Sequence, residues 1–155
     1  MLIALNLWAR GKIAGPHFYI SEYMEENRDE YLERLRLASA ESQWTEWVEF
    51  FLRAVESQAN QNIILSEKIS ALYDEMKETF REVLASQWAM RTVDYVFERP
   101  VFRNSAFTRS SGIPEQTAHR ITRTLSDKQL LTTIEPAAGR RPALYAFMPL
   151  LDIVR

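Results

Sequence analysis

The chain has 155 residues, a formal net charge of −2, an apolar fraction of 46% and no cysteine. This apolar content supports a folded core and argues against global disorder. Without cysteine, disulfides and thiolate metal sites are excluded, and two histidines make a zinc site improbable. We therefore predict neither a metal nor a cofactor.

The chain opens with an apolar stretch, Met1 to Ala9, in which nearly every side chain is apolar. The stretch is too short to span a bilayer, and its basic residues Arg10 and Lys12 follow it, unlike those of a signal peptide. We expect no membrane partner and a cytoplasmic location. A helix here should be buried on all sides, and Gly11 and the Gly15-Pro16 pair should end it.

A helical body is predicted next, because no glycine or proline occurs between Pro16 and Pro100. Ser21 is a good N-cap for a helix over 22–39, which the spacing allows as one helix or two. Apolar residues again recur at helical spacing from Trp44 onward and from Ile64 to Leu84. They allow either one long helix over about three-quarters of the stretch between Pro16 and Pro100, or two helices that break near Gln58–Asn62. Trp44 and Trp47 are expected to be core anchors. An antiparallel bundle explains this spacing better than a coiled coil does.

A last helix of the body is predicted over 86–98, ended by Pro100. We place the domain boundary there, with a helical domain over 1–98 and a second domain over 99–155. The charge divides at the same point. Residues 1–98 hold 10 basic and 17 acidic residues, a net −7, whereas residues 99–155 hold 9 and 4, a net +5. A basic C-terminal module on an acidic body is typical of a nucleic-acid contact confined to one end.

The C-terminal module has the order of parts of a winged helix-turn-helix. A short helix over Phe107–Ser110 is followed by a turn at Gly112 and by a second helix, for which Pro114 suits the first position. Two short strands should then flank the tip Gly139-Arg140-Arg141-Pro142. The predicted fold class is mainly α: a helical bundle followed by a winged helix-turn-helix with a small β wing.

The second helix of this motif would present one face to duplex DNA. Ala118, Ile121 and Leu125 share the face that must pack inward. On the outer side, Gln116 could pair with adenine and Arg120 with guanine, while Thr117 and Arg123 reach phosphates. At the tip, Arg140 and Arg141 could contact the backbone or a minor groove. These six residues are the predicted DNA-binding residues.

Catalytic residues are not expected. His119 should be a polar surface residue of the second helix, and His17 follows Pro16 in a loop. Neither has a serine, cysteine or acidic cluster arranged around it in the sequence. The acidic run between Glu22 and Glu33 is most simply a solvated face, since no Glu-x-x-His motif accompanies it.

Several sequence segments together resemble the C-terminal half of proteins of the Fic family (filamentation induced by cAMP). Many members of this family transfer AMP from ATP to protein hydroxyls. The segments are Tyr19-Ile20-Ser21-Glu22-Tyr23, Asn27-Arg28-Asp29-Glu30-Tyr31, Trp44-Thr45-Glu46-Trp47-Val48-Glu49-Phe50-Phe51-Leu52 and Glu98-Arg99-Pro100-Val101-Phe102. The family's chemistry resides in a His-Pro-Phe-x-acid-Gly-Asn-Gly-Arg loop. That loop is absent here, so no catalytic or nucleotide-binding residue is carried over, and the chain resembles the part that follows the loop.

Three functions remain open at this point. The first is a non-catalytic, regulatory Fic-type remnant whose winged helix binds DNA. The second is a component of a protein AMP-transferase whose catalytic half is supplied by another chain. The third is a protein-interaction module. A homodimer through the opening helix is also expected, because removing half of a core should leave apolar surface on Met1–Ala9.

Overall fold

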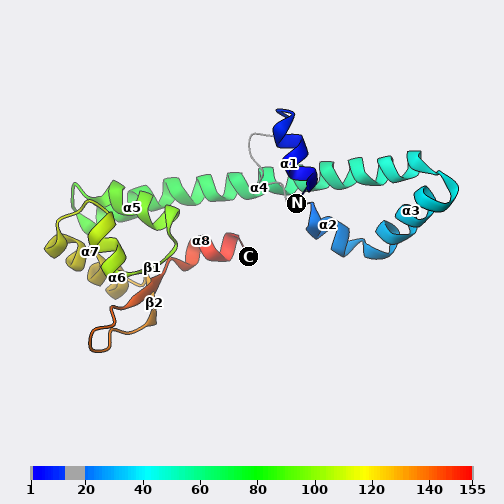
Figure 1. The fold of residues 1–155 in the computed structure, drawn as a ribbon. Coiled ribbons are helices and arrows are strands. Elements are labelled where there is room, and N and C mark those ends of the chain that lie inside the picture. Colours follow the sequence, from blue (N-terminus) through cyan, green and yellow to red (C-terminus); the bar gives the residue numbers. More distant parts are fainter. Residues whose placement is uncertain (1, 13–19, 155) are drawn as a thin grey trace. The chain divides into compact units, whose positions relative to one another are not determined.

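The computed structural model describes residues 2–12 and 20–154 (Figure 1). These residues are mainly helical, with a three-stranded antiparallel sheet near the C-terminus. The chain forms two compact units, Met1–Ile64 and Leu65–Arg155. The predicted boundary after Glu98 therefore falls inside the second unit. Among the described helices, none combines the length and apolarity that crossing a membrane requires.

The first helix of the first unit, α1, spans Leu2–Ala9. It ends as predicted at Gly11, which adopts a positive φ of 65° that glycine tolerates without strain. The predicted burial on all sides is wrong, because Leu5 is 39% and Trp8 is 49% exposed. Full burial requires neighbours all round the helix, and the described residues do not cover these two side chains. The predicted turn at Gly15-Pro16 and the His17 loop lie outside the described residues.

Two helices occupy the region predicted over 22–39: α2 over Ser21–Glu26 and α3 over Arg28–Glu41. Asn27 separates them with φ −111° and ψ 36°, and its side-chain amide donates to the Tyr23 carbonyl at 2.8 Å. Ser21 is not the N-cap that the sequence indicated. Ile20 occupies that position and already has helical dihedral angles, so the helix begins one residue early and makes no side-chain cap.

Helix α4 runs without a break over Trp44–Leu84, a length of 41 residues, which decides between the two predicted alternatives. Its first part belongs to the first unit and pairs with α3. Phe50 and Ala54 are fully buried there, and the Phe50 ring lies 6.4 Å from that of Tyr31 and 6.0 Å from that of Trp47. This aromatic cluster is the core of the unit.

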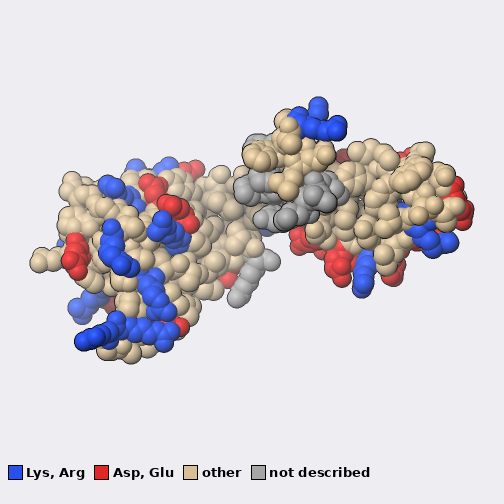
Figure 2. Space-filling view, in the orientation of Figure 1, with Lys and Arg blue, Asp and Glu red and all other residues tan. Residues whose placement is uncertain are grey.

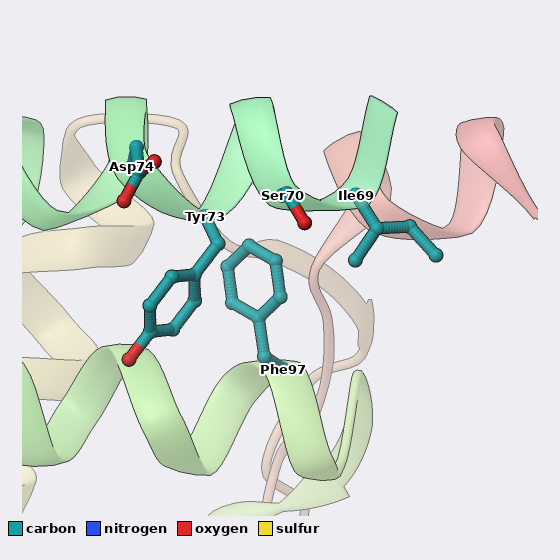
Figure 3. Close-up of a pocket in the computed structure, with 5 residues that line it drawn as sticks. All are labelled: Ile69, Ser70, Tyr73, Asp74 and Phe97. Atoms are coloured by element: carbon teal, nitrogen blue, oxygen red, sulfur yellow. The ribbon is translucent and has the colours of Figure 1, made fainter. Parts of the chain in front are cut away.

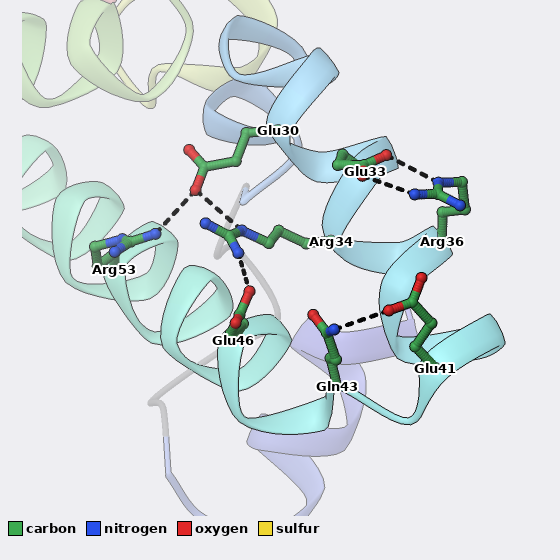
Figure 4. Close-up of polar contacts among 8 residues, drawn as sticks. All are labelled: Glu30, Glu33, Arg34, Arg36, Glu41, Gln43, Glu46 and Arg53. Carbon is green, nitrogen blue, oxygen red and sulfur yellow. Dashed lines mark hydrogen bonds and ion pairs between the residues drawn. The ribbon is translucent and has the colours of Figure 1, made fainter.

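Polar contacts line one edge of the α3 and α4 pair (Figure 4). Arg53 lies 3.0 Å from Glu30, and Arg34 contacts both Glu30 and Glu46. Within α3, hydrogen bonds from Arg36 lower the pKa of the Glu33 carboxyl. These pairs are exposed, and exposed pairs contribute little each. We therefore expect these ion pairs to define the polar edge of the α3 and α4 pair and to add little to its stability.

Apolar side chains of the same two helices remain exposed. Trp44 is 58% exposed, which makes the prediction of a core anchor wrong for this residue, whereas half-buried Trp47 packs on Tyr31 at 5.7 Å. Val48 and Leu52 follow Trp44 at four-residue intervals and are exposed too, as are Leu32 and Leu35 of α3. Helical spacing alone could not distinguish this stripe from a buried one.

In the second unit, the core lies between the last part of α4, helix α5 (Ala89–Glu98) and the C-terminal module. Phe80, Val93 and Phe107 are fully buried. The Phe107 ring stands edge-on to Tyr95 at 4.9 Å and lies 5.6 Å from Phe102. Helix α5 begins three residues later than predicted, and Pro100 follows its end as expected.

The sheet is formed by β1 (Val101–Arg103), β2 (Thr132–Glu135) and β3 (Leu144–Ala146), in the spatial order β1-β3-β2. Strand β3 lies in the centre, with Phe102 opposite Tyr145 on one side and Thr133 opposite Tyr145 on the other. The two strands predicted around the tip are present as β2 and β3, while β1 was not predicted. A further short helix, α8 over Met148–Ile153, follows β3.

Helices α6 (Asn104–Ser110) and α7 (Glu115–Asp127) lie between β1 and β2 in the chain. Gly112 in the turn between them has φ +68°, so the glycine is required by the backbone as predicted. Pro114 is the N-cap of α7 and not its first residue. Its ψ of 136° is extended, and its carbonyl accepts the first bond of the helix, from the Ala118 amide at 2.9 Å.

Candidate nucleic-acid interface

Helix α7 is strongly amphipathic. Ala118, Ile121 and Leu125 are at most 1% exposed, as their spacing predicts, and Thr122 joins them on the buried face. Gln116, Arg120 and Arg123 are exposed on the other side, and Thr117 is half-buried at its edge. The four residues predicted to contact DNA from this helix therefore all lie outside its core-facing stripe.

The turn before α7 is held against α5. The guanidinium of Arg91 lies so close to Gly112 that a Cβ there would overlap it. Nearby, Arg99 donates to the Ser110 hydroxyl at 3.3 Å and stacks over the Tyr95 ring at 5.6 Å. A pocket of about 240 Å³ lies between α5 and the turn. These contacts fix the direction in which α7 leaves the turn.

The tip of the β2–β3 hairpin is a tight turn. The backbones of Ala138 and Arg141 exchange two hydrogen bonds, of 3.0 and 2.9 Å, and Gly139 has φ +56°. Arg140 and Arg141 are exposed there, as the sequence suggested. They differ in their partners, however: among the described residues Arg141 has an ion-pair partner and Arg140 has none.

Glu135 of β2 is the partner of Arg141. Its Oε2 lies 2.6 Å from Arg141 Nη2 and 3.1 Å from Arg103 Nη2. Arg103 also donates to the Pro142 carbonyl at 3.2 Å, so it ties β1 to both arms of the hairpin. Sequence reasoning missed Glu135, because the contact joins residues that are distant along the chain.

Basic side chains gather on this part of the second unit. Figure 2 shows Lys and Arg over the region that Figure 1 labels α6, α7 and β2. Glu135 is the acidic residue in close contact with this group, through Arg103 and Arg141. The acidic residues of α7 are more distant from their basic neighbours: Asp127 lies 3.9 Å from Arg123, and Glu115 lies 3.8 Å from His119. The basic residues of β1 and the segments after it are Arg103, Arg109, Arg120, Arg123, Lys128, Arg140, Arg141 and Arg155.

One polar cluster was not predicted. Asn104 Nδ2 lies 3.0 Å from His119 Nδ1, and the Thr122 hydroxyl lies 3.1 Å from Asn104 Oδ1. His119 is on the surface, as the sequence suggested, but its ring is held by a residue of α6.

A second pocket, of about 290 Å³, lies between α4 and α5. Figure 3 shows the Tyr73 ring reaching from α4 toward α5 beside Phe97, to which it is perpendicular at 5.1 Å. The Tyr73 hydroxyl donates to Asp94 at 2.6 Å, and this bond raises the pKa of Tyr73. The pocket is lined by Ile69, Ser70, Tyr73, Asp74 and Phe97. The Asp74 carboxylate is paired with Lys77 at 2.9 Å, so its ionic partner is on α4 itself.

The part of the chain that the structure describes holds no group of three or more histidine, aspartate or glutamate side chains arranged to bind a metal ion. No model of a known protein family matches the sequence. The exposed face of α7 and the hairpin tip are therefore the strongest candidate site.

Proposed function

We propose that this chain is a non-catalytic regulatory protein that binds duplex DNA through a winged helix-turn-helix, formed by α6, α7 and the β2–β3 hairpin. Its helical part corresponds to the C-terminal part of a Fic-type domain without the catalytic loop. The observation that carries the proposal is the amphipathic α7, which follows a glycine turn and directs Gln116, Arg120 and Arg123 away from the core.

The proposed binding follows from the dimensions of the major groove, which accepts one α-helix. Arg120 is the side chain suited to guanine and Gln116 the one suited to adenine. Thr117 and Arg123 flank them and contact phosphates, which position the helix without reading sequence. The arginine tip of the hairpin contacts the backbone or the minor groove beside it.

The hairpin tip supports a sharper version of this proposal. A phosphate that approaches Arg141 must compete with Glu135, whose carboxylate lies 2.6 Å from the guanidinium, whereas Arg140 has no such competitor among the described residues. We therefore assign the phosphate contact of the tip to Arg140 first.

A salt titration of duplex binding tests the proposal. Each phosphate contact contributes about 0.9 to the slope of log K against log salt concentration. Wild-type binding should weaken steeply with salt. Arg140→Ala should reduce the slope by about 1, Arg141→Ala by less, and Glu135→Gln should raise it by about 1 because Arg141 is released. Asp152→Asn, which removes an exposed charge on α8, is the matched control for the change in net charge.

Two results would contradict these assignments. Absence of duplex binding would remove the proposed DNA contact altogether, and binding that does not depend on salt would remove its phosphate contacts. Equal losses for Arg140→Ala and Arg141→Ala, with no effect of Glu135→Gln, would leave the DNA contact in place and refute the competition by Glu135.

The exposed apolar residues of the first unit favour a second candidate, a protein interaction. Trp44, Val48 and Leu52 form a stripe of the kind that usually marks a contact with another protein. Under this second candidate, the chain is a protein-interaction module. Alternatively, it is a component of an AMP-transferase, and a second chain supplies the catalytic half and covers the stripe. Transfer of labelled AMP from ATP by the chain alone would contradict the non-catalytic proposal.

A homodimer through α1 is also proposed, with Leu5 and Trp8 in the contact. Light scattering should then give about twice the chain mass of 18.1 kDa. The double variant Leu5→Gln with Trp8→Gln should shift the protein to a monomer, since it removes the apolar area that drives association. Asn6→Gln changes an exposed polar position of the same helix and should leave the dimer intact. A wild-type monomer at high concentration would rule the dimer out.

A further inference from the structure

His119 lies at the edge of the exposed face of α7, where α6 approaches it. Its side chain is 53% exposed. On the protein side, Asn104 Nδ2 lies 3.0 Å from Nδ1 of the imidazole. On the outer side, Nε2 lies 3.8 Å from the Glu115 carboxylate, too far for a hydrogen bond. One nitrogen is therefore held by the fold, and the other remains available to a ligand.

Asn104 and Thr122, which lie behind His119, can form hydrogen bonds with the imidazole in either of its charge states. The Thr122 hydroxyl has three acceptors in reach: Asn104 Oδ1 at 3.1 Å, the His119 carbonyl at 3.1 Å and the Ala118 carbonyl at 3.3 Å. When the hydroxyl donates to Asn104 Oδ1, Asn104 Nδ2 donates to Nδ1 of a neutral ring, and the ring proton is on Nε2.

The same three side chains also satisfy the charged ring. If the Thr122 hydroxyl donates to a backbone carbonyl, the Asn104 amide can turn over. Its Nδ2 then donates to Thr122 Oγ1, and its Oδ1 accepts from Nδ1–H of an imidazolium. His119 can therefore gain a proton without leaving a polar group of the cluster unpaired, and the ring keeps its position.

The charges around this ring come from both helices. On α7 they are Glu115 and, one turn later, Arg123. On α6 the basic residue is Arg109, whose guanidinium donates to the Ser105 carbonyl at 3.0 Å. Arg103 ends β1 just before α6, and its guanidinium is engaged by Glu135 and the Pro142 carbonyl. A phosphate at Nε2 would add a negative charge next to the ring and so favour the imidazolium.

We propose that His119 is a further phosphate contact of the α7 face, which binds the DNA backbone through Nε2–H in its imidazolium form while Asn104 and Thr122 hold the ring. This inference rests on the proposed duplex binding, and it adds that the affinity for duplex DNA depends on pH. Because an imidazolium attracts a phosphate more strongly than a neutral imidazole does, duplex affinity should rise as the pH falls. Uptake of one proton allows at most about a tenfold change per pH unit.

The test is a titration of a short labelled duplex at constant salt between pH 8 and pH 5.5, with affinity measured by fluorescence anisotropy. The wild type should bind more tightly as the pH falls. His119→Gln keeps a side chain that can hydrogen-bond but cannot become charged, and it should lose most of this rise. Thr122→Val keeps the shape of the side chain but removes the acceptor for the turned amide, so it should show a smaller rise than the wild type.

Glu115→Gln is the control for the nearest carboxylate, whose own protonation would also favour DNA at low pH. It should retain the rise, since the rise is assigned to His119. A wild-type affinity that is constant with pH, or a rise that His119→Gln retains, would overturn the role of His119. Failure of the wild type to bind duplex at any pH would instead overturn the proposed function, so the two failures are distinguishable.

Discussion

Replacing Arg120 and Arg123 together by alanine is expected to abolish most of the duplex binding of this chain. A guanidinium that contacts a guanine edge contributes about 1–3 kcal/mol of discrimination, so loss of Arg120 should weaken binding by roughly one to two orders of magnitude and relax the sequence preference. Loss of Arg123 should weaken binding to all sequences and lower the salt slope by about 1.

The measurement is the affinity for a panel of duplexes at several salt concentrations, for the two single variants and the double variant. Both arginines are exposed, so neither substitution should disturb the core. Arg36→Ala, which removes an exposed arginine from α3 in the first unit, is the matched control. Unchanged binding by the double variant would remove α7 as the DNA-reading helix.

The largest expected effect on stability comes from Phe107→Ala in the second unit. Phe107 is fully buried and joins α6 to both α5 and β1 through the rings of Tyr95 and Phe102, at 4.9 and 5.6 Å. Truncation of a buried phenylalanine to alanine costs about 3–5 kcal/mol. The free energy of unfolding, measured with denaturant, should fall by that amount.

Val101→Ala is the matched control for this substitution. Val101 lies in β1 next to Phe102 but is 50% exposed, so its truncation should cost well below the loss at Phe107. Similar losses at the two positions would contradict the packing described for Phe107. A loss of α7 helicity in Phe107→Ala before the rest of the unit unfolds would show that this ring anchors the module.

Local signals in the sequence predicted the turn of the C-terminal module and the buried face of its second helix. Gly112 indicated the turn, and the spacing of Ala118, Ile121 and Leu125 identified the buried face of α7, because both follow from backbone geometry and helical period. The absence of glycine and proline allowed a continuous helix between Trp44 and Leu84 but left a break near Gln58–Asn62 equally open.

What the sequence could not predict depends on contacts between distant residues. Strand β1 was missed because three residues after a proline carry too little alternation to indicate a strand. Glu135 and Asn104 were missed because their roles exist only once β2 meets the hairpin tip and α6 meets α7. The predicted burial of Leu5 and Trp44 was wrong for a related reason. Periodicity locates an apolar face but does not say whether anything covers it.

The placement of the tryptophans makes the two units separately visible by spectroscopy. Trp8, Trp44 and Trp47 belong to the first unit, whereas Trp88 is the single tryptophan of the second and packs, half-buried, against its core. A variant that keeps only Trp88 would report the melting of the second unit by its emission alone, and one that keeps only Trp47 would report that of the first. Tryptophan emission can thus be used to follow the thermal unfolding of each unit separately.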